Sequence, residues 1–177
     1  EDNETEVEGN RTKVDFVPWQ KRNASECLAG CKCRGAVMTC YTENGKIMTI
    51  QAGRSGKTIV IEINNTKTET ELNVTSENES DNMNRTRLKV KLSNGRNAEI
   101  KIMPDTAAAK AIERLKLKVC NESNNCTIVL KDTGIRNITG YTKMKYIITA
   151  LKERRFLFWK WNKQVQANVD AETGEVD

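Results

Sequence analysis

Two kinds of residue in this sequence are suited to covalent chemistry: cysteines, which form disulfides, and asparagines in Asn-x-Ser/Thr sequons, which accept N-linked glycans. Both occur in the stretch CNESNNCT at positions 120–127. Ten sequons, none with a central proline, lie at Asn3, Asn10, Asn23, Asn64, Asn73, Asn78, Asn84, Asn121, Asn125 and Asn137. Chance would give about two at this composition, and a single sequon is a weak motif. Their density predicts N-glycosylation and an extracellular, cell-surface location, rather than an Asn- and Thr-rich loop protein that is never glycosylated.

The six cysteines predict three disulfides, because an even number of cysteines in an exported chain is typical of a disulfide framework. Cys120 and Cys126 stand apart from the others, and their bond is expected to stabilise the fold by about 2 kcal/mol. The other four lie within CLAGCKCRGAVMTC, a cysteine-rich subregion at 27–40, and their pairing stays open: Cys27, Cys31, Cys33 and Cys40. A zinc site is the alternative for this cluster, but its spacing lacks paired C-x2-C arms and zinc suits an oxidising compartment poorly.

The sequence does not favour an enzyme, because it has no histidine. Ser-His-Asp and Cys-His machinery and most catalytic metal sites are therefore excluded, and oxidised cysteines offer no thiolate nucleophile. Carboxylate pairs would have to come from strand residues such as Glu62, Glu99 and Asp132, all at phases expected to face solvent. GRSGKT at 53–58 lacks the spacing of a phosphate-binding loop and is interpreted as a turn. We therefore expect no catalytic residues, no metal and no cofactor other than covalent glycans.

Charge is distributed unevenly along the chain. Residues 85–163 carry nineteen Lys/Arg and six Asp/Glu, whereas the remainder carries ten and eighteen, within an overall net charge of +5. The simplest interpretation is acidic solvated tails flanking a basic sheet. A stronger hypothesis is that subunits meet head to tail through opposite charges. Dense glycosylation argues against nucleic acid as the partner of the basic centre, and a polyanionic surface glycan is the more plausible ligand.

Two apolar stretches are candidate subunit contacts. FLFWKW at 156–161 holds four of the nine aromatic residues and is either a core strand, an apolar contact surface or a membrane-interface segment. The polar N-terminus, residues 1–20, is predicted to be an extension that adds as a strand to a sheet edge of a neighbouring subunit. The predicted contact residues in the two stretches are Val14, Phe16, Val17, Trp19, Phe156, Phe158, Trp159 and Trp161.

Periodicity predicts an α+β fold, mostly antiparallel sheet with one principal helix at about 105–119, in a single disulfide-stapled domain over 21–177. Asn44-Gly45 and Asn94-Gly95 predict hairpins with type I′ turns, in which both residues have positive φ. Strands are expected at 57–64, at 126–132, weakly within TETELNVT, and over much of 146–170. The helix MPDTAAAKAIERLKLKV carries an apolar stripe, with Asp105 or Thr106 as its cap. No apolar run approaches the roughly eighteen residues that cross a bilayer.

Several stretches resemble a known group of proteins. KLSNGRNAEIKIMPDTA, LKLKVCNESNNCTIVLKD, VQANVDAETGEV, the CLAGCKC cluster and NGKIMTIQAGRSGKTIV are similar to uncharacterised exported archaeal surface proteins rich in cysteines and sequons. The closing VDAETGEV also resembles the end of PepSY-type domains, which implies a helix packed on an antiparallel sheet. The resemblance supplies no activity or catalytic residue. Members often continue toward a hydrophobic tail, so a membrane anchor beyond Asp177 stays open, and Glu1 is interpreted as the start of a mature form.

The expected function is that of a non-enzymatic, N-glycosylated archaeal surface protein that self-assembles into an extracellular filament or a similar structure. The alternative is a monomeric PepSY-like binding or inhibitory module with a preformed groove and a soluble partner.

Overall fold

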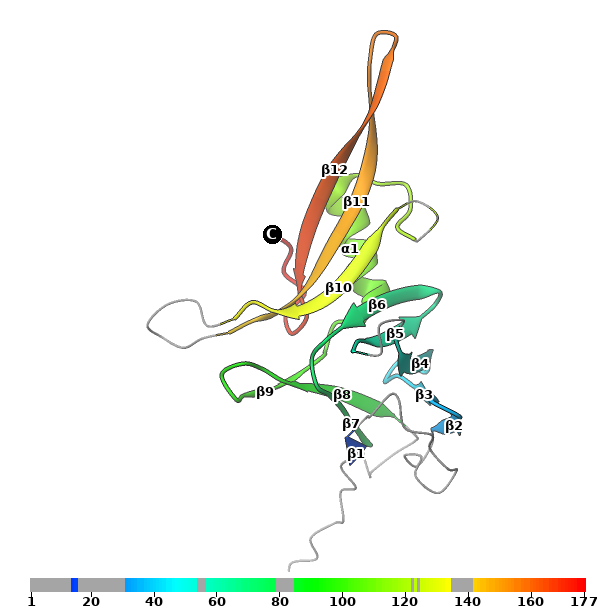
Figure 1. Ribbon diagram of the computed structural model, residues 1–177, viewed down its shortest axis with the longest axis vertical. Coiled ribbons are helices and arrows are strands. Elements are labelled where there is room, and N and C mark those ends of the chain that lie inside the picture. Colours follow the sequence, from blue (N-terminus) through cyan, green and yellow to red (C-terminus); the bar gives the residue numbers. More distant parts are fainter. Residues whose placement is uncertain are drawn as a thin grey trace, which may run out of the picture.

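The computed structural model describes residues 14–15, 31–53, 57–78, 85–121, 123, 125–134 and 142–177. Two sheets and one helix make up this part of the chain (Figure 1). The larger sheet has the strand order β12-β11-β10-β6-β5-β4-β3-β2. Its strands are β2 (Lys32–Arg34), β3 (Val37–Tyr41), β4 (Ile47–Ala52), β5 (Ile59–Ile63), β6 (Thr66–Thr70), β10 (Thr127–Asp132), β11 (Met144–Phe156) and β12 (Trp159–Asp170). The smaller sheet, in the order β1-β7-β8-β9, contains β1 (Val14–Asp15), β7 (Val74–Asn78), β8 (Thr86–Lys91) and β9 (Asn97–Glu99).

The described residues confirm the prediction of a mostly antiparallel sheet with one helix. Every strand pair in the described residues is antiparallel except β6 with β10, which are parallel. This pair joins two runs of neighbouring strands, and two buried threonines strengthen it. The Thr68 and Thr70 hydroxyls donate to the carbonyl oxygens of Ile128 and Leu130, at 3.1 and 2.9 Å. Buried hydroxyls with such partners avoid the cost of an unsatisfied polar group.

In the second Asn-Gly hairpin, the alternation of apolar and polar residues predicts one shared face for Leu88, Val90, Leu92, Ala98, Ile100 and Ile102. The buried face confirms this prediction except at Ile102, which is only partly buried. The other side chains are buried in β8, β9 and the adjoining residues. They join one cluster of buried side chains that extends from Met38 in β3 to Ala171 after β12. A period of two in the sequence therefore fixes which face of these strands is buried.

The type I′ prediction for both Asn-Gly turns is wrong. Each turn is a three-residue loop in which only the glycine has positive φ, 71° at Gly45 and 82° at Gly95. The Gly45 N–H donates to the Thr42 carbonyl, and the Thr42 N–H donates to that of Lys46. This is a type I turn closed by a left-handed glycine, which needs no positive φ at the asparagine. A two-residue turn with two positive φ values does occur, at Asn64 and Asn65 between β5 and β6.

The helix is shorter than predicted, and its predicted caps are wrong. α1 (Pro104–Leu115) begins one residue earlier and ends four residues earlier than the interval 105–119. Its N-cap is Met103, which makes no side-chain hydrogen bond, and Pro104 takes the first helical position, where its missing N–H costs nothing. The helix ends because Lys116 adopts a left-handed φ of 54° and Leu117 N–H donates to the Ile112 carbonyl.

α1 packs on one face of the larger sheet, against β5, β6, β11 and β12. Its buried side chains are small: Pro104, Ala107, Ala108 and Ala111. They allow the helix to approach the strands closely, and the buried Tyr146 hydroxyl donates to the Ile102 carbonyl oxygen at 2.7 Å just before the helix. Burial raises the pKa of Tyr146 well above its usual range. The helix is therefore fixed against the base of the β11–β12 hairpin.

Candidate interaction surface on the β11–β12 hairpin

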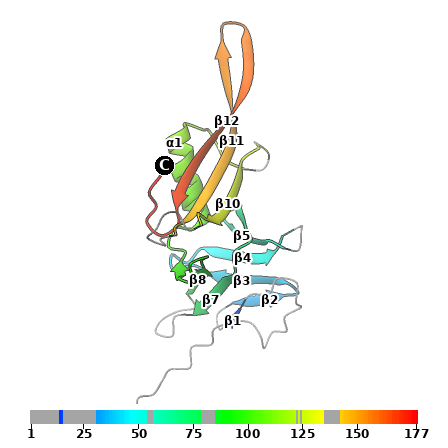
Figure 2. The same ribbon diagram turned by 60° about the vertical axis from the view of Figure 1, so that its left-hand side comes forward.

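The β11–β12 hairpin is the longest element of the fold and extends beyond the rest of the molecule (Figures 1 and 2). The two strands pair continuously from Lys145 opposite Asp170 to Phe156 opposite Trp159. β10 pairs with β11 only as far as Thr149. Residues 151–164, which we call the ribbon, are therefore a two-stranded projection with no third strand among the described residues. An isolated two-stranded ribbon buries few side chains and is only marginally stabilised by them, so its exposed side chains are the better guide to its role.

The end of the ribbon is apolar and exposed. The turn residues Leu157 and Phe158 are 79% and 96% exposed, and the following Trp159 and Trp161 are 77% and 49% exposed. The interpretation of FLFWKW as a core strand is therefore wrong. Large apolar side chains at a projecting tip are unfavourable in water and mark sites of contact with another surface.

The structure describes only part of the remaining predicted contact residues. The backbone of Val14 lies in β1, which pairs with β7 of the same chain through Val14 opposite Ser76 and Asp15 opposite Thr75. Phe16, Val17 and Trp19 lie outside the described residues, as does the side chain of Phe156. The structure therefore gathers Phe158, Trp159 and Trp161 at one tip.

The turn at the tip has an unusual composition. Leu157 has a φ of 54°, in the left-handed region that normally favours glycine or asparagine. A bulky residue there costs about 1 kcal/mol relative to glycine. The fold thus holds an exposed leucine in a disfavoured conformation, which is typical of positions where the side chain contributes to function rather than to stability.

One face of the ribbon combines basic and aromatic side chains. Since side chains alternate along a strand, this face carries Lys152, Arg154, Trp159, Trp161 and Lys163, and we call it the basic-aromatic face. It continues the face that is buried under α1 nearer the base. At the end of the helix the Lys152 ammonium donates to the Leu115 carbonyl at 2.6 Å. The ribbon as a whole carries five Lys/Arg and one Glu, a net charge of +4.

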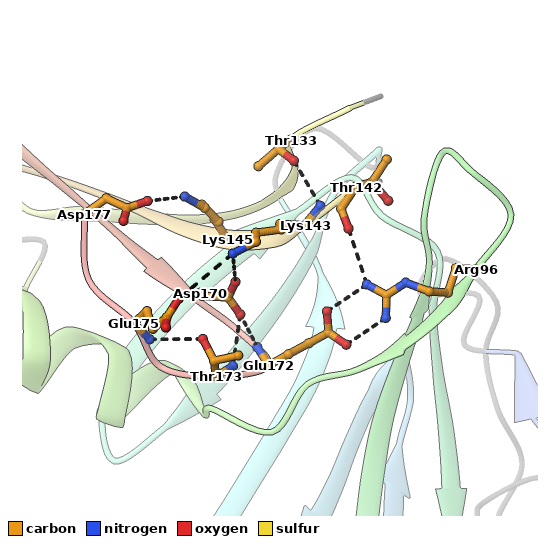
Figure 3. A network of polar contacts seen from close by, with 10 residues as sticks. All are labelled: Arg96, Thr133, Thr142, Lys143, Lys145, Asp170, Glu172, Thr173, Glu175 and Asp177. Carbon is orange, nitrogen blue, oxygen red and sulfur yellow. Dashed lines mark hydrogen bonds and ion pairs between the residues drawn. The ribbon is translucent and has the colours of Figure 1, made fainter. Parts of the chain in front are cut away.

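The base of the hairpin is fixed by a polar network at the C-terminal turn, which we call the clasp (Figure 3). Asp170 is 4% exposed, and its carboxylate accepts hydrogen bonds from the N–H groups of Glu172 and Thr173 at 2.9 and 3.0 Å. The Lys143 ammonium lies 3.7 Å from the same carboxylate. The Gly174 N–H donates to the Asp170 carbonyl oxygen, and Gly174 has a φ of 78°. A glycine in AETGEV predicts a turn at this point of the sequence, and the positive φ of Gly174 is consistent with it.

The clasp also ties the hairpin to the smaller sheet. The guanidinium of Arg96, in the turn between β8 and β9, donates to both carboxylate oxygens of Glu172 at 2.8 Å (Figure 3). Such a bidentate pair is geometrically specific. The N–H groups of Lys101 and Ile102 donate to the Ala171 carbonyl oxygen at 3.0 and 2.9 Å. The hairpin is thus held at its base and projects from a fixed support.

Asp132, one of the carboxylates considered for catalysis, has a structural role. Its carboxylate accepts from the N–H of Ser93 at 2.6 Å and from that of Gly134 at 2.9 Å. Partial burial acts to raise its pKa, but these hydrogen bonds and the nearby Arg96 outweigh it and hold the pKa of the Asp132 carboxyl below its usual range. The ionised carboxylate therefore fixes the β8–β9 turn to the end of β10.

Replacing Asp132 with alanine is expected to lower the free energy of unfolding by about 1 kcal/mol at pH 7, because the lost hydrogen bonds are partly exposed to water. A lowered pKa gives stability that is present above the unfolded pKa of about 3.9 and lost as the pH falls through the folded pKa. Urea denaturation at pH 7 and pH 3 should show the difference between variant and wild type shrinking at pH 3. Glu69→Ala, at an exposed strand position, is the control; an equal loss in both variants would contradict this role.

Five sequon asparagines lie in the part of the chain that the structure describes, and none of them is in the ribbon. Asn64, Asn73, Asn121 and Asn125 are exposed, in the turns after β5, after β6 and before β10, whereas Asn78 lies in β7 with its side chain outside the described residues. The predicted acceptors Asn3, Asn10, Asn23, Asn84 and Asn137 also lie outside them. No sequon occurs after Asn137. The hairpin sequence therefore carries no acceptor for a bulky glycan.

Disulfides are present, and two of them lie wholly within the described residues. Cys31 is bonded to Cys40, which links the segment before β2 to the end of β3, and Cys120 is bonded to Cys126 as predicted. Cys33 is also disulfide-bonded, whereas Cys27 lies outside the described residues. Cys31 and Cys40 are thus not available as zinc thiolates. Disulfide bonding is compatible with an extracellular location.

A polar cleft of about 410 Å³ lies where the β3–β4 turn meets β8 and β9. The Arg87 guanidinium lies in it, 3.1 Å from the Glu43 carboxylate and 3.8 Å from that of Glu99. Three of its charged groups, Arg87, Glu43 and Glu99, are paired with one another, which is typical of a structural contact. Within the described ranges no group of three or more Cys, Asp or Glu is placed to hold a metal, and no helix is long and apolar enough to cross a membrane.

Comparisons with protein-family models, with curated proteins and with solved structures found no match.

Proposed function

We propose that the chain is an N-glycosylated extracellular structural protein that assembles with copies of itself into a filament or similar structure at an archaeal cell surface. The observation that carries the proposal is the ribbon tip, where Leu157, Phe158 and Trp159 are each more than three-quarters exposed. Covering these side chains with a partner would recover about 25 cal/mol for each Å² of apolar surface removed from water.

Two further observations support contact between protein subunits at this tip. The hairpin carries no sequon, so no predicted glycan is attached to the hairpin itself. β1, where the N-terminal extension meets the smaller sheet, lies at the opposite end of the long axis from the hairpin turn (Figures 1 and 2). A contact between opposite ends is heterologous, and repetition of a heterologous contact that does not close into a ring gives an open filament.

Sedimentation velocity of the glycosylated full-length protein over a range of concentrations tests the proposal. We expect large species that increase with concentration. A single monomeric boundary at all concentrations, in low salt and in 1 M salt, would overturn the proposal. A monomer that instead floats with lipid vesicles would assign the tip to membrane contact.

A further inference from the structure

The ribbon has an open edge as well as an exposed face. β10 stops pairing with β11 at Thr149, so residues 150–156 of β11 pair only with β12 among the described strands. Exposed strand edges are templates for an added strand. The side chains of β11 that lie on the basic-aromatic face along this edge include Lys152 and Arg154, two residues apart. An added strand with carboxylates at every second position would place them beside these two cations.

The chain contains one such segment. In residues 1–8, EDNETEVE, five of eight residues are acidic and none is basic. Asp2, Glu4, Glu6 and Glu8 recur with a period of two, so an extended segment would present all four carboxylates on one face. The seven residues 2–8 equal in number the seven residues 150–156 of the open edge. The segment thus matches the edge in length, in charge and in the spacing of its charges.

We propose that residues 2–8 of one copy add as a strand to the open edge of β11 in a second copy, with their carboxylates beside Lys152 and Arg154. This inference rests on the proposed self-assembly and names its interface. The other face of the added strand would carry Asn3, Thr5 and Val7, while the one acidic residue of the ribbon, Glu153, lies on that opposite face. No two carboxylates are then forced together. The sequon at Asn3 would likewise place its glycan away from the basic-aromatic face.

The position of β1 agrees with an intermolecular rather than an intramolecular arrangement. β1 pairs with β7 at the end of the molecule opposite the ribbon tip (Figures 1 and 2). Five residues, 9–13, separate the acidic segment from β1, and they span at most about 18 Å when extended. When copies stack end to end, the ribbon of one copy lies next to the N-terminal end of the next copy. Residues 2–8 then need not extend far from their own subunit.

Complementary charge reversals test this interface in the full-length protein. Arg154→Glu in one variant, and Glu4→Lys with Glu6→Lys in another, are each expected to weaken self-association at least about tenfold at 0.1 M salt, because like charges then meet. In an equimolar mixture, the edge that carries the Arg154→Glu change can pair with the lysine-bearing segment of the other variant. The unchanged edge of that other variant can pair with an acidic segment. We expect the mixture to recover assemblies that neither variant forms alone.

Lys160→Glu is the matched control, because Lys160 is exposed and one rung from Arg154 on the opposite face of the ribbon. It makes the same charge change and is expected to assemble as the wild type does. Circular dichroism and melting temperature verify that all variants fold.

Four results would overturn the inference. The first is normal assembly of Arg154→Glu, and the second is a mixture of the two variants that does not recover assemblies. In both cases the wild type still assembles, so the proposed function is unaffected. Capture of wild-type monomers by vesicles containing anionic lipid, lost in Arg154→Glu, would assign the edge to a membrane surface instead. A wild type that never self-associates would overturn both the proposed function and this interface.

Discussion

Replacing Trp159 and Trp161 together with serine is expected to weaken self-association at least hundredfold while leaving the fold intact. Buried tryptophans at protein interfaces each contribute about 2 kcal/mol or more, and a hundredfold change corresponds to about 2.7 kcal/mol. In the free chain the two side chains are 77% and 49% exposed, so their loss removes little packing. The melting temperature should therefore change by no more than about 2 °C. Sedimentation velocity and thermal denaturation of the same samples provide the two readouts.

A matched control exists in the β3–β4 hairpin. Tyr41 and Ile47 are cross-strand neighbours beside a turn and are 42% and 58% exposed. The variant Tyr41→Ser with Ile47→Ser removes a comparable exposed apolar pair from a different part of the molecule and should leave self-association unchanged. If both double variants lost association equally, the effect would come from general loss of surface hydrophobicity, and the hairpin tip would not be the contact.

Replacing Asp170 with alanine is expected to lower the free energy of unfolding by about 3 kcal/mol. The substitution leaves two N–H groups, those of Glu172 and Thr173, without their acceptor, and a buried donor without a partner costs about 1–3 kcal/mol. It also removes the carboxylate that faces Lys143 at 3.7 Å. Asp170→Asn keeps one acceptor oxygen and should cost less. Equilibrium denaturation in urea measures both changes.

Glu175→Ala serves as the control for Asp170. The Glu175 carboxylate is 72% exposed and lies 4.0 Å from the same Lys143 ammonium, so its loss should change stability by less than about 0.5 kcal/mol. A loss of under 1 kcal/mol in Asp170→Ala would contradict the view that the clasp fixes the base of the hairpin. The variant should still self-associate below its melting temperature, because the tip is unchanged.

Local sequence patterns predicted the parts of the fold that depend on local physics. The alternation in RLKVKLSNGRNAEIKI identified the buried faces of β8 and β9, and the apolar stripe from Ala108 to Leu115 identified the helix. The helix boundaries were less accurate, because Pro104 at the first turn and the left-handed Lys116 set them. Proline at the first turn is a recognisable signal, whereas a lysine in a left-handed cap is not, since glycine is the usual residue there.

The hairpin that carries the candidate site could not be predicted from the sequence. The segment YIITALKERRFLFWKWNKQVQANVD contains no glycine, proline or Asn-Gly pair near its reversal, and the chain turns at Leu157 and Phe158, two apolar residues. Turn chemistry gives no signal for such a reversal. The aromatic content of FLFWKW did mark the segment, but only the reversal shows that its side chains are exposed at a tip.

Contacts between distant parts of the chain were also beyond local patterns. The bidentate pair of Arg96 with Glu172 and the parallel pairing of β6 with β10 depend on tertiary packing. Asp170 carried a partial signal, since an aspartate two to four residues before a turn glycine often accepts local N–H bonds. Its burial follows from the three-dimensional fold alone.

The most direct test of self-assembly through the hairpin is electron microscopy of native protein sheared from cells, identified by mass spectrometry of the same material. Assembly through the hairpin predicts regular filaments made of this chain, in which averaged images show each hairpin in contact with the N-terminal end of the next subunit. Dispersed particles of monomer size, or filaments in which the hairpins project freely into solvent, would contradict it.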